Sequence, residues 1–282
     1  MPKNKILVLG ASGVGKTHYA GQLLGRLRHD RKGKLRLRTG GVDDLSKLEE
    51  VLACLEEGRA AGHTPADTWT GIHCLLETTN GSKVSLDWPE YAGERLLSII
   101  ERRTLPLEWR NSVEASTGWM LFLRPSTLKL HEDILERPTG LPPVHTSSNG
   151  SSVDGSSWDD RARYTELLQM LLFAAGKSTF KKANKPRLSI VLSCWDELET
   201  IKTPEEILAN RLPMLNAFIR SYWQDSAWSV WGLSSLGRHL SQKKQDDDFA
   251  SQGPEHFGYV IPPQSMDKDP DLTAPVAWLL EV

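Results

Sequence analysis

Four short, mainly apolar runs are the strongest pattern along the chain. They are rich in leucine, β-branched and aromatic residues, and they are Ile6–Leu9, Trp119–Leu123, Leu188–Leu192 and Trp228–Leu233. A strand that is buried on both faces of a parallel sheet has this composition, because neither face meets water. The four runs therefore predict the central strands of a mostly parallel sheet.

Segments that favour helix lie between these runs. They are residues 16–27, 45–61, 95–102 and 158–175, and leucines recur at helical spacing in the second of them. A further helix should begin after Thr203, since Thr203-Pro204-Glu205-Glu206 offers an N-cap, a first-turn proline and a capping-box glutamate. Pro213 should break or kink that helix.

One antiparallel hairpin is expected before the second apolar run. Residues 72–79 and 83–86 flank Asn80-Gly81, a dipeptide that suits a tight turn because both positions tolerate positive φ. Strands that alternate with helices of this length indicate an α/β fold. We expect a three-layer α/β/α sandwich whose sheet is mostly parallel and contains one antiparallel hairpin strand.

The length of the chain limits the number of domains that it can form. With 282 residues it can form one large α/β domain, and we expect a single domain over residues 1–282. Residues 138–157 are dense in Pro, Gly and Ser, which predicts a flexible insertion. Residues 241–250 should form a charged, exposed excursion.

A phosphate-binding loop follows the first apolar run. Residues 10–17 read Gly-Ala-Ser-Gly-Val-Gly-Lys-Thr, which satisfies Gly-x4-Gly-Lys-Thr between an expected strand and an expected helix. Lys16 should reach the β- and γ-phosphates as a catalytic cation, and the Thr17 hydroxyl should bind Mg²⁺. The expected nucleotide-binding residues are Gly10, Ala11, Ser12, Gly13, Val14, Gly15, Lys16, Thr17 and His18.

The alternative for this loop is a glycine-rich turn that serves packing alone. The spacing together with the Lys-Thr pair favours a P-loop NTPase fold that binds a nucleoside triphosphate with Mg²⁺. The loop by itself does not choose guanine over adenine.

Further segments follow in the order found in the Ras-like GTPases, which this chain resembles. Residues 89–94 resemble the Asp-x-x-Gly region of that family. The resemblance implies that the Gly93 amide senses the γ-phosphate, and that Glu94 stands where the family has the residue that orients the attacking water. Asp87 ends the expected hairpin strand and is our preferred carboxylate on the Mg²⁺ side, whereas Glu90 has the family's spacing to Gly93. Asp87 could instead belong to a charged loop without a ligand, and Glu94 could be a first-turn acid of the next helix.

The loop before the hairpin, residues 63–69, corresponds in position to the first switch loop of the Ras-like GTPases. Thr68 is expected to close on Mg²⁺ and the γ-phosphate, with Thr64 as the alternative, and either could be a turn hydroxyl. Arg95 and Arg124 are candidates for a catalytic arginine in cis, and a partner protein could supply one in trans.

The third apolar run is followed by Ser193-Cys194-Trp195-Asp196, which aligns with the family's Asn/Thr-Lys-x-Asp motif. The Asp196 carboxylate could accept hydrogen bonds from guanine N1–H and the exocyclic amine, a pattern that adenine does not offer. It could also be only a helix cap.

Two further features bear on binding of the base. Cys194 replaces the lysine that covers the base in the family, and Trp195 could supply apolar cover. A loop that resembles Ser-Ala-Lys and would present backbone to the guanine follows the fourth run: Ser234, Ser235 and Leu236.

A second resemblance comes from the C-terminal tail. Residues 258–262 and 271–279, with residues 87–94, resemble the bacterial double-GTPase proteins of defence and conflict systems. The resemblance covers most of the chain. It implies protein partners that bind or regulate the switch, including a second GTPase.

The composition of the chain limits which partners and which cellular compartment we expect. A formal net charge of −2, from 34 basic and 36 acidic residues, gives no electrostatic reason to expect nucleic acid or a membrane surface. No apolar run reaches the roughly 20 residues of a membrane span. Three widely spaced cysteines suggest neither a disulfide framework nor a zinc site, so we expect a reducing, cytoplasmic location.

These observations favour a GTP-binding switch that hydrolyses GTP with Mg²⁺, slowly or under stimulation by a partner. Two alternatives stay open. One is an ATP-binding P-loop protein in which Asp196 is structural, and the other is a nucleotide-binding scaffold without catalysis, suggested by Cys194 and Glu94.

Overall fold

The four apolar runs form neighbouring parallel strands in the computed structural model. The structure describes residues 3–29, 33–42, 45–62, 69–91, 93–131, 159–177 and 181–281. The strands are β1 (Lys3–Leu9), β5 (Gly118–Leu123), β6 (Arg187–Ser193) and β7 (Trp228–Ser234). Each pairs in parallel with the next, which confirms the expected core of the sheet.

The complete sheet has eight strands in the order β2-β3-β4-β1-β5-β6-β7-β8. The expected hairpin is present: β3 (Trp69–Thr78) pairs antiparallel with β4 (Lys83–Tyr91), which itself pairs in parallel with β1. Gly81 takes a positive φ of 80° in the turn, and Asn80 does not. The hairpin therefore needs only one left-handed residue.

Two antiparallel edge strands extend the sheet beyond the expectation. They are β2 (Leu35–Val42), which pairs with β3, and β8 (Tyr259–Ile261), which pairs with β7. The first contains Gly40-Gly41 and has an irregular register, and the second has three residues. The alternation Leu35-Arg36-Leu37-Arg38 was an available signal for β2, whereas the three residues of β8 are too few to be recognised in a sequence.

Alternation along β1 divides the hydrophobic core into two layers. Ile6 and Val8 belong to one buried cluster, and Leu7 and Leu9 belong to the other. Successive side chains of a strand point to opposite faces of its sheet. The sheet is therefore covered on both faces, as a three-layer sandwich requires.

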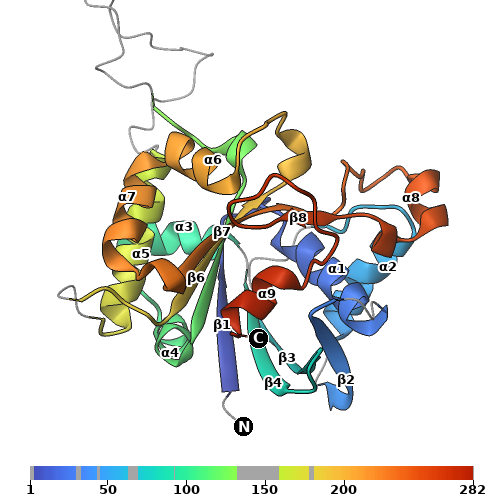
Figure 1. The fold of residues 1–282 in the computed structure, drawn as a ribbon, viewed down its shortest axis with the longest axis horizontal. Helices are drawn as coiled ribbons and strands as arrows, with labels where there is room; N and C mark the ends of the chain where they lie inside the picture. The colour runs from blue at the N-terminus through green and yellow to red at the C-terminus, as the bar shows by residue number, and fades with distance from the viewer. Residues whose placement is uncertain are drawn as a thin grey trace, which may run out of the picture.

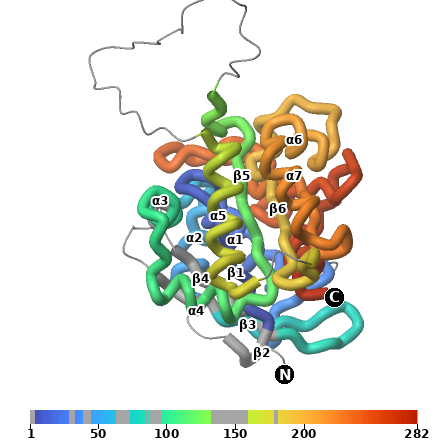
Figure 2. Tube along the Cα trace, turned by 90° about the vertical axis from the view of Figure 1, so that its left-hand side faces the viewer, coloured from blue at the N-terminus to red at the C-terminus, as the bar shows by residue number. Residues whose placement is uncertain are grey.

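Helices cover the two faces separately (Figure 1). The face reached by Ile6 and Val8 carries α1 (Lys16–His29), α2 (Ser46–Glu56) and α9 (Ala274–Leu279). The opposite face carries α3 (Gly93–Arg102), α4 (Leu107–Ala115), α5 (Asp160–Ala174), α6 (Pro204–Arg211) and α7 (Pro213–Tyr222). Figure 2 shows α5 lying lengthwise over this second face. The α/β/α arrangement is confirmed.

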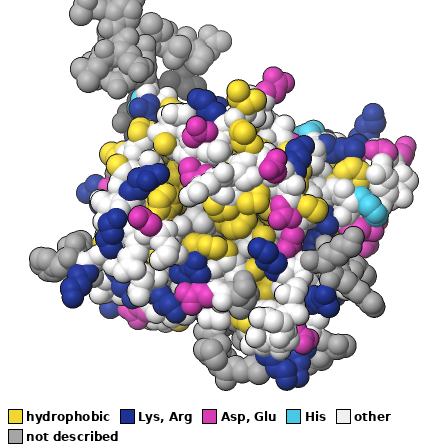
Figure 3. Space-filling view, in the orientation of Figure 1, with side chains coloured by type: hydrophobic (Ala, Val, Ile, Leu, Met, Phe, Trp, Pro, Cys, Tyr) yellow, Lys and Arg dark blue, Asp and Glu magenta, His cyan; other side chains and the backbone are white. Residues whose placement is uncertain are grey.

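The remaining helical elements are short. They are α8 (Asp247–Gln252) and the 3-10 turns η1 (Pro125–Thr127), η3 (Trp195–Glu197), η4 (Asp225–Ala227) and η5 (Pro254–His256). Among the described residues, no helix has both the length and the apolar character of a membrane span. Figure 3 shows acidic and basic side chains interspersed over one face of the molecule.

Several boundaries differ from the sequence expectations. The second helix ends at Glu56 instead of continuing to residue 61, because Gly58 turns the chain with φ of 69° and accepts a hydrogen bond from Asp246 N–H at 2.9 Å. Helix α4 was not expected. The capping box of Thr203 and Glu206 is present, and α7 begins at Pro213 where a break was expected. The expected insertion at 138–157 lies outside the described residues.

Candidate functional site

The loops that follow β1, β5, β6 and β7 meet at one edge of the sheet, because the carboxyl ends of parallel strands lie together. They line a cavity of about 550 Å³, a size that suits a small-molecule ligand. The residues that were singled out from the sequence and line it are Ser12, Gly13, Val14, Gly15, Lys16, Thr17, His18, Arg124, Ser193, Cys194, Asp196, Ser235 and Leu236. The phosphate and base segments thus share one cavity.

The P-loop is shaped by its glycines. Gly13 and Gly15 have φ of 75° and 82°, values that favour glycine because other residues meet steric strain there. At Gly10 a Cβ atom would lie 2.9 Å from Val14 Cγ2 and 3.0 Å from Phe122 Cβ, so the loop packs closely on β5. This geometry leads directly into α1, where Tyr19 N–H donates to Gly15 O at 3.0 Å.

Lys16 lies across the P-loop from the first turn of α1. Its Nζ donates to the carbonyl oxygens of Gly10 at 2.8 Å and Ala11 at 2.7 Å. The ammonium group is therefore held at the loop, and Thr17 and His18 line the cavity beside it. A phosphate ligand would find a helix N-terminus and a lysine at the same place.

Asp196 also lines the cavity and belongs to η3. Its Oδ1 accepts a hydrogen bond from Ser234 Oγ at the end of β7. The same Ser234 hydroxyl accepts from Gly237 N–H at 3.0 Å. Ser234, at the end of the neighbouring strand, therefore orients the Asp196 carboxylate.

The two other residues of the base motif have different environments. Ser193 is 2% exposed, and its hydroxyl donates to Leu123 O at 3.1 Å, which joins the ends of β6 and β5. Trp195 is buried against Gly232, where a Cβ atom would lie 2.7 Å from the indole ring. Trp195 belongs to the hydrophobic core and is not among the residues that line the cavity, in contrast to the apolar base cover that its sequence position suggested.

Cys194 takes a left-handed conformation with φ of 52° and ψ of 45° between β6 and η3. Burial raises the pKa of its thiol to about 11, although the nearby Arg124 partly opposes the shift. The side chain is neutral at pH 7. The cation that the Ras-like pattern places at this position is therefore absent from residue 194.

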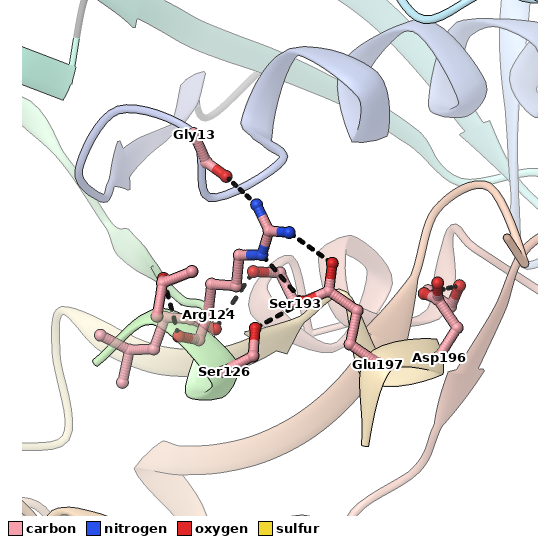
Figure 4. Close-up of polar contacts among 9 residues, drawn as sticks. Gly13, Arg124, Ser126, Ser193, Asp196 and Glu197 are labelled. Carbon is pink, nitrogen blue, oxygen red and sulfur yellow. Dashed lines mark hydrogen bonds and ion pairs between the residues drawn. The ribbon is translucent and has the colours of Figure 1, made fainter. Parts of the chain in front are cut away.

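Arg124 supplies a positive charge at the same place from the neighbouring strand (Figure 4). Its Nη1 donates to Gly13 O at 3.1 Å, and its Nε donates to Glu197 Oε2 at 3.0 Å. Glu197 also accepts from Arg124 Nη2 and from the Ser126 hydroxyl. The hydrogen bond with Glu197 raises the pKa of Arg124. Burial alone would raise the pKa of Glu197, but the hydrogen bonds from Arg124 and Ser126 and the nearby positive charge together lower it.

Sequence reasoning missed several residues of the cavity. Glu197 follows Asp196 directly, and that adjacency was the available signal. Arg238, His239 and Lys243 also line the cavity, and Lys243 belongs to residues 241–250, which were expected to be only an exposed excursion. Arg238 is itself held by Asp248 at 2.9 Å and lies over the Phe257 ring at 4.6 Å.

The structure describes only some of the residues that the sequence predicts for the switch loops. Thr64 and Thr68 lie outside the described residues. Asp87 was expected to end its strand, but β4 continues to Tyr91, and Asp87 pairs with Lys5 of β1. Lys5 precedes Gly10, the first residue of the P-loop, by five residues, so Asp87 lies some way before the loop. Glu90 is three residues further along β4 in the same direction, and its backbone therefore lies closer to the P-loop than that of Asp87.

Helix α3 begins at Gly93, which places Glu94 and Arg95 in its first turn. Of these residues the structure gives the backbone position only. Within the described part of the chain, no group of three His, Cys, Asp or Glu side chains could hold a metal ion by itself.

Comparison with known proteins gives one family. The model of the family described as Double-GTPase 1 matches residues 7–279. No curated protein matches the chain. A solved small GTPase, Arl6 BBS3 from Trypanosoma brucei with the bound nucleotide analogue GppNp, is 10% identical with a TM-score of 0.43, over 99% of this chain and 96% of that one.

Two larger proteins are similar over part of their length. The bacterial selenocysteine-specific elongation factor EF-Sec is 13% identical with a TM-score of 0.35, over 83% of this chain and 26% of that one. Roco2 RocCORdC from Methanosarcina barkeri, bound to GDP, is 12% identical with a TM-score of 0.30, over 89% and 48% respectively.

Proposed function

Because the chain belongs to the Double-GTPase 1 family, we propose that it binds GTP with Mg²⁺ in the cavity at the carboxyl edge of the sheet and hydrolyses it. The observation that carries the proposal is the shared cavity. Lys16 and residues of the P-loop line it together with Asp196, which is held by Ser234. One nucleotide could thus meet a phosphate site and a base site together.

The phosphate end would use electrostatics that the local structure supplies. The first turn of α1 directs backbone N–H groups and the positive end of its dipole toward an anion. Lys16 adds a full positive charge at the same loop, and it would exchange its contacts with Gly10 and Ala11 carbonyls for phosphate oxygens. This end would bind any nucleoside triphosphate.

The base end would provide selectivity. An ionised Asp196 accepts hydrogen bonds and donates none, so it matches the two adjacent donors of guanine. Adenine would leave the carboxylate opposite an acceptor, and a site built for a hydrogen bond rejects a ligand that lacks it. The contact with Ser234 supports this role because it fixes the carboxylate before a base arrives.

Mg²⁺ would be held by the Thr17 hydroxyl, which lines the cavity, together with nucleotide phosphates and a carboxylate from β4. Oxygen ligands of this kind suit Mg²⁺, which shields the charge on the phosphates. The register of β4 leads us to favour Glu90 over Asp87 for the carboxylate. Thr68 or Thr64 would complete the site from the preceding loop.

The output would be a conformational switch. Gly93 begins α3, so a γ-phosphate contact with its amide would couple the nucleotide state to that helix. Glu94 in the next position would orient water poorly if it repels the γ-phosphate, which is why we propose slow or partner-stimulated hydrolysis. A regulator or a second GTPase in a bacterial defence system is the kind of partner that the resemblance suggests.

The test is binding of fluorescent GTP and ATP analogues with Mg²⁺, with phosphate release followed in the same samples. We expect a preference for GTP of at least about a hundredfold, and loss of that preference in Asp196→Asn. Lys16→Ala should abolish binding of both nucleotides. Asp225→Asn is the control, since that side chain is 91% exposed and is not among the residues lining the cavity.

Each outcome decides something. Equal binding of ATP, or an Asp196→Asn variant that still prefers GTP, would overturn the guanine site. Tight GTP binding without phosphate release, also after addition of cell extract, would leave a nucleotide-binding scaffold in place of an enzyme.

A further inference from the structure

The side chain of Arg124 joins the P-loop to the segment that bears Asp196. Its guanidinium contacts Gly13 O in the P-loop and both carboxylate oxygens of Glu197, the residue after Asp196 (Figure 4). Arginine can do this because its planar fork carries several N–H donors in fixed directions. A neutral side chain could not bridge the two loops in this way.

The backbone around Arg124 is held from several elements. Ser193 Oγ donates to Leu123 O at 3.1 Å, and Arg211 Nη1 from α6 donates to Pro125 O at 2.7 Å. Thr127 N–H donates to Arg124 O at 3.1 Å within η1. Residues on both sides of Arg124 are therefore fixed, so its side chain leaves the end of β5 in a defined direction.

The partner carboxylate is equally constrained. Glu197 accepts from Ser126 as well as from Arg124, and the side chains of the pair keep 28% (Arg124) and 29% (Glu197) of their accessible surface. Both residues line the cavity, and a partly buried pair is screened less by salt than a fully exposed one. A carboxylate here without its arginine would repel the phosphates of a nucleotide.

Cys194 explains why such a bridge is needed. Its thiol faces the P-loop, because a Cβ atom built on Gly15 would lie 3.9 Å from Cys194 Sγ. A cysteine can neither carry a positive charge to that loop nor reach across it with several donors. The base segment thus has no cation of its own at residue 194 that could contact the P-loop.

We propose that Arg124 is a positioning residue for the nucleotide: together with Glu197 it fixes the distance between the P-loop and Asp196, and it provides the cation that Cys194 does not. This inference rests on the proposed function. It gives Arg124 a role in nucleotide affinity, in place of the role of a catalytic arginine in cis.

The experiment measures GTP affinity with Mg²⁺ for the wild type, Arg124→Ala, Arg124→Lys, Arg124→Ala/Glu197→Ala and Arg124→Ala/Cys194→Lys. Loss of hydrogen bonds to a charged group should weaken binding by about tenfold or more in Arg124→Ala. Arg124→Lys should retain part of the affinity. Removing Glu197 as well should recover only the part of the loss that comes from the unpaired carboxylate.

The variant with Cys194→Lys is the decisive one. A lysine at residue 194 starts beside Gly15 and can bring a cation back to the P-loop, so it should recover most of the affinity that Arg124→Ala loses. A purely structural role of Arg124 would not be restored from a different strand. Thermal unfolding of each variant, measured without nucleotide, separates loss of affinity from loss of folding.

Three results would overturn the inference. Arg124→Ala could bind GTP as tightly as the wild type, Arg124→Ala/Glu197→Ala could recover the full affinity, or Cys194→Lys could fail to rescue a folded Arg124→Ala. If the wild type itself binds no GTP, the proposed function fails and the inference fails with it. If the wild type binds GTP and the variants bind it with the same affinity, the inference about Arg124 fails but the proposed function stands.

Discussion

Asp196 and Ser234 come from the ends of different strands, and a single hydrogen bond joins them at the cavity. The Ser234 side chain is fully buried, and it also accepts from Gly237 N–H. A buried hydroxyl with a donor and an acceptor in place has one preferred orientation. The direction of the Asp196 carboxylate is therefore set by a residue 38 positions further along the chain.

Replacing Ser234 by alanine should weaken guanine-nucleotide binding by roughly tenfold, because a hydrogen bond to a charged group is lost. The preference for GTP over ATP should fall as well, since a mobile carboxylate discriminates less. Titration calorimetry with GDP and ADP measures both effects. Ser221→Ala on α7 is the control, as its hydroxyl donates only within its own helix. An unchanged affinity of Ser234→Ala for GDP would refute this account of Asp196.

At the scale of elements, β7 and η3 are packed too closely for any side chain at Gly232. A Cβ atom there would lie 2.7 Å from the Trp195 ring and 3.0 Å from Ile261 Cβ. Trp195 immediately precedes Asp196, so pressure on its indole would displace the base segment. This contact explains why a tryptophan in the base motif serves packing.

Gly232→Ala should lower the free energy of unfolding by about 1–3 kcal/mol, the usual cost of an overpacked core. It should also weaken GTP binding, because η3 must move to relieve the contact. Urea denaturation and nucleotide titration measure the two effects. Gly62→Ala controls for stability, since a Cβ there meets no described heavy atom within 4 Å. Equal stability of the two variants would contradict the close packing.

The register of β4 against β1 is a second property of elements. Residues 83–86, which follow the Asn80-Gly81 turn, were expected to form a strand that ends at Asp87. The strand instead continues to Tyr91 through its pairing with β3, past the carboxylate that was expected to terminate it. Register depends on backbone pairing with another strand, so it is not encoded in either strand alone.

At the scale of the whole molecule, the C-terminal segment returns to the helix that follows the P-loop. Tyr19 donates to Leu272 O at 2.8 Å, and Gln22 donates to Pro254 O at 3.0 Å. Arg26 Nη2 donates to Phe257 O at 2.7 Å. These contacts join positions more than 230 residues apart and hold α1 in place against the tail.

Tyr19→Phe tests this connection. Burial raises the pKa of Tyr19, so its hydroxyl stays protonated and donates over the whole range in which the protein is studied. Without it the buried Leu272 carbonyl loses a donor, which should cost about 1–2 kcal/mol in the free energy of unfolding. Urea denaturation measures the loss.

Tyr164→Phe is the matched control for Tyr19→Phe. Tyr164 is also buried, and no hydrogen bond from its hydroxyl is found in the described part of the chain. A similar loss of stability in both variants would show that the contact with Leu272 contributes nothing specific.

The sequence by itself determined the central strands, the capped helix after Thr203, the P-loop and the presence of Asp196 after β6. These features are local: apolar runs, capping residues and the Gly-x4-Gly-Lys-Thr spacing act through backbone geometry and burial within a few residues. The family match over residues 7–279 agrees with what they predicted about fold.

Only the tertiary structure decided which distant residues meet. The edge strands β2 and β8, the burial of Trp195, the level of Asp87 and the bridge from Arg124 to Gly13 and Glu197 all depend on contacts between separate elements. Such contacts follow from the order and register of strands in the sheet, which residue spacing does not specify. For that reason the sequence identified the two halves of the cavity, and the fold identified what joins them.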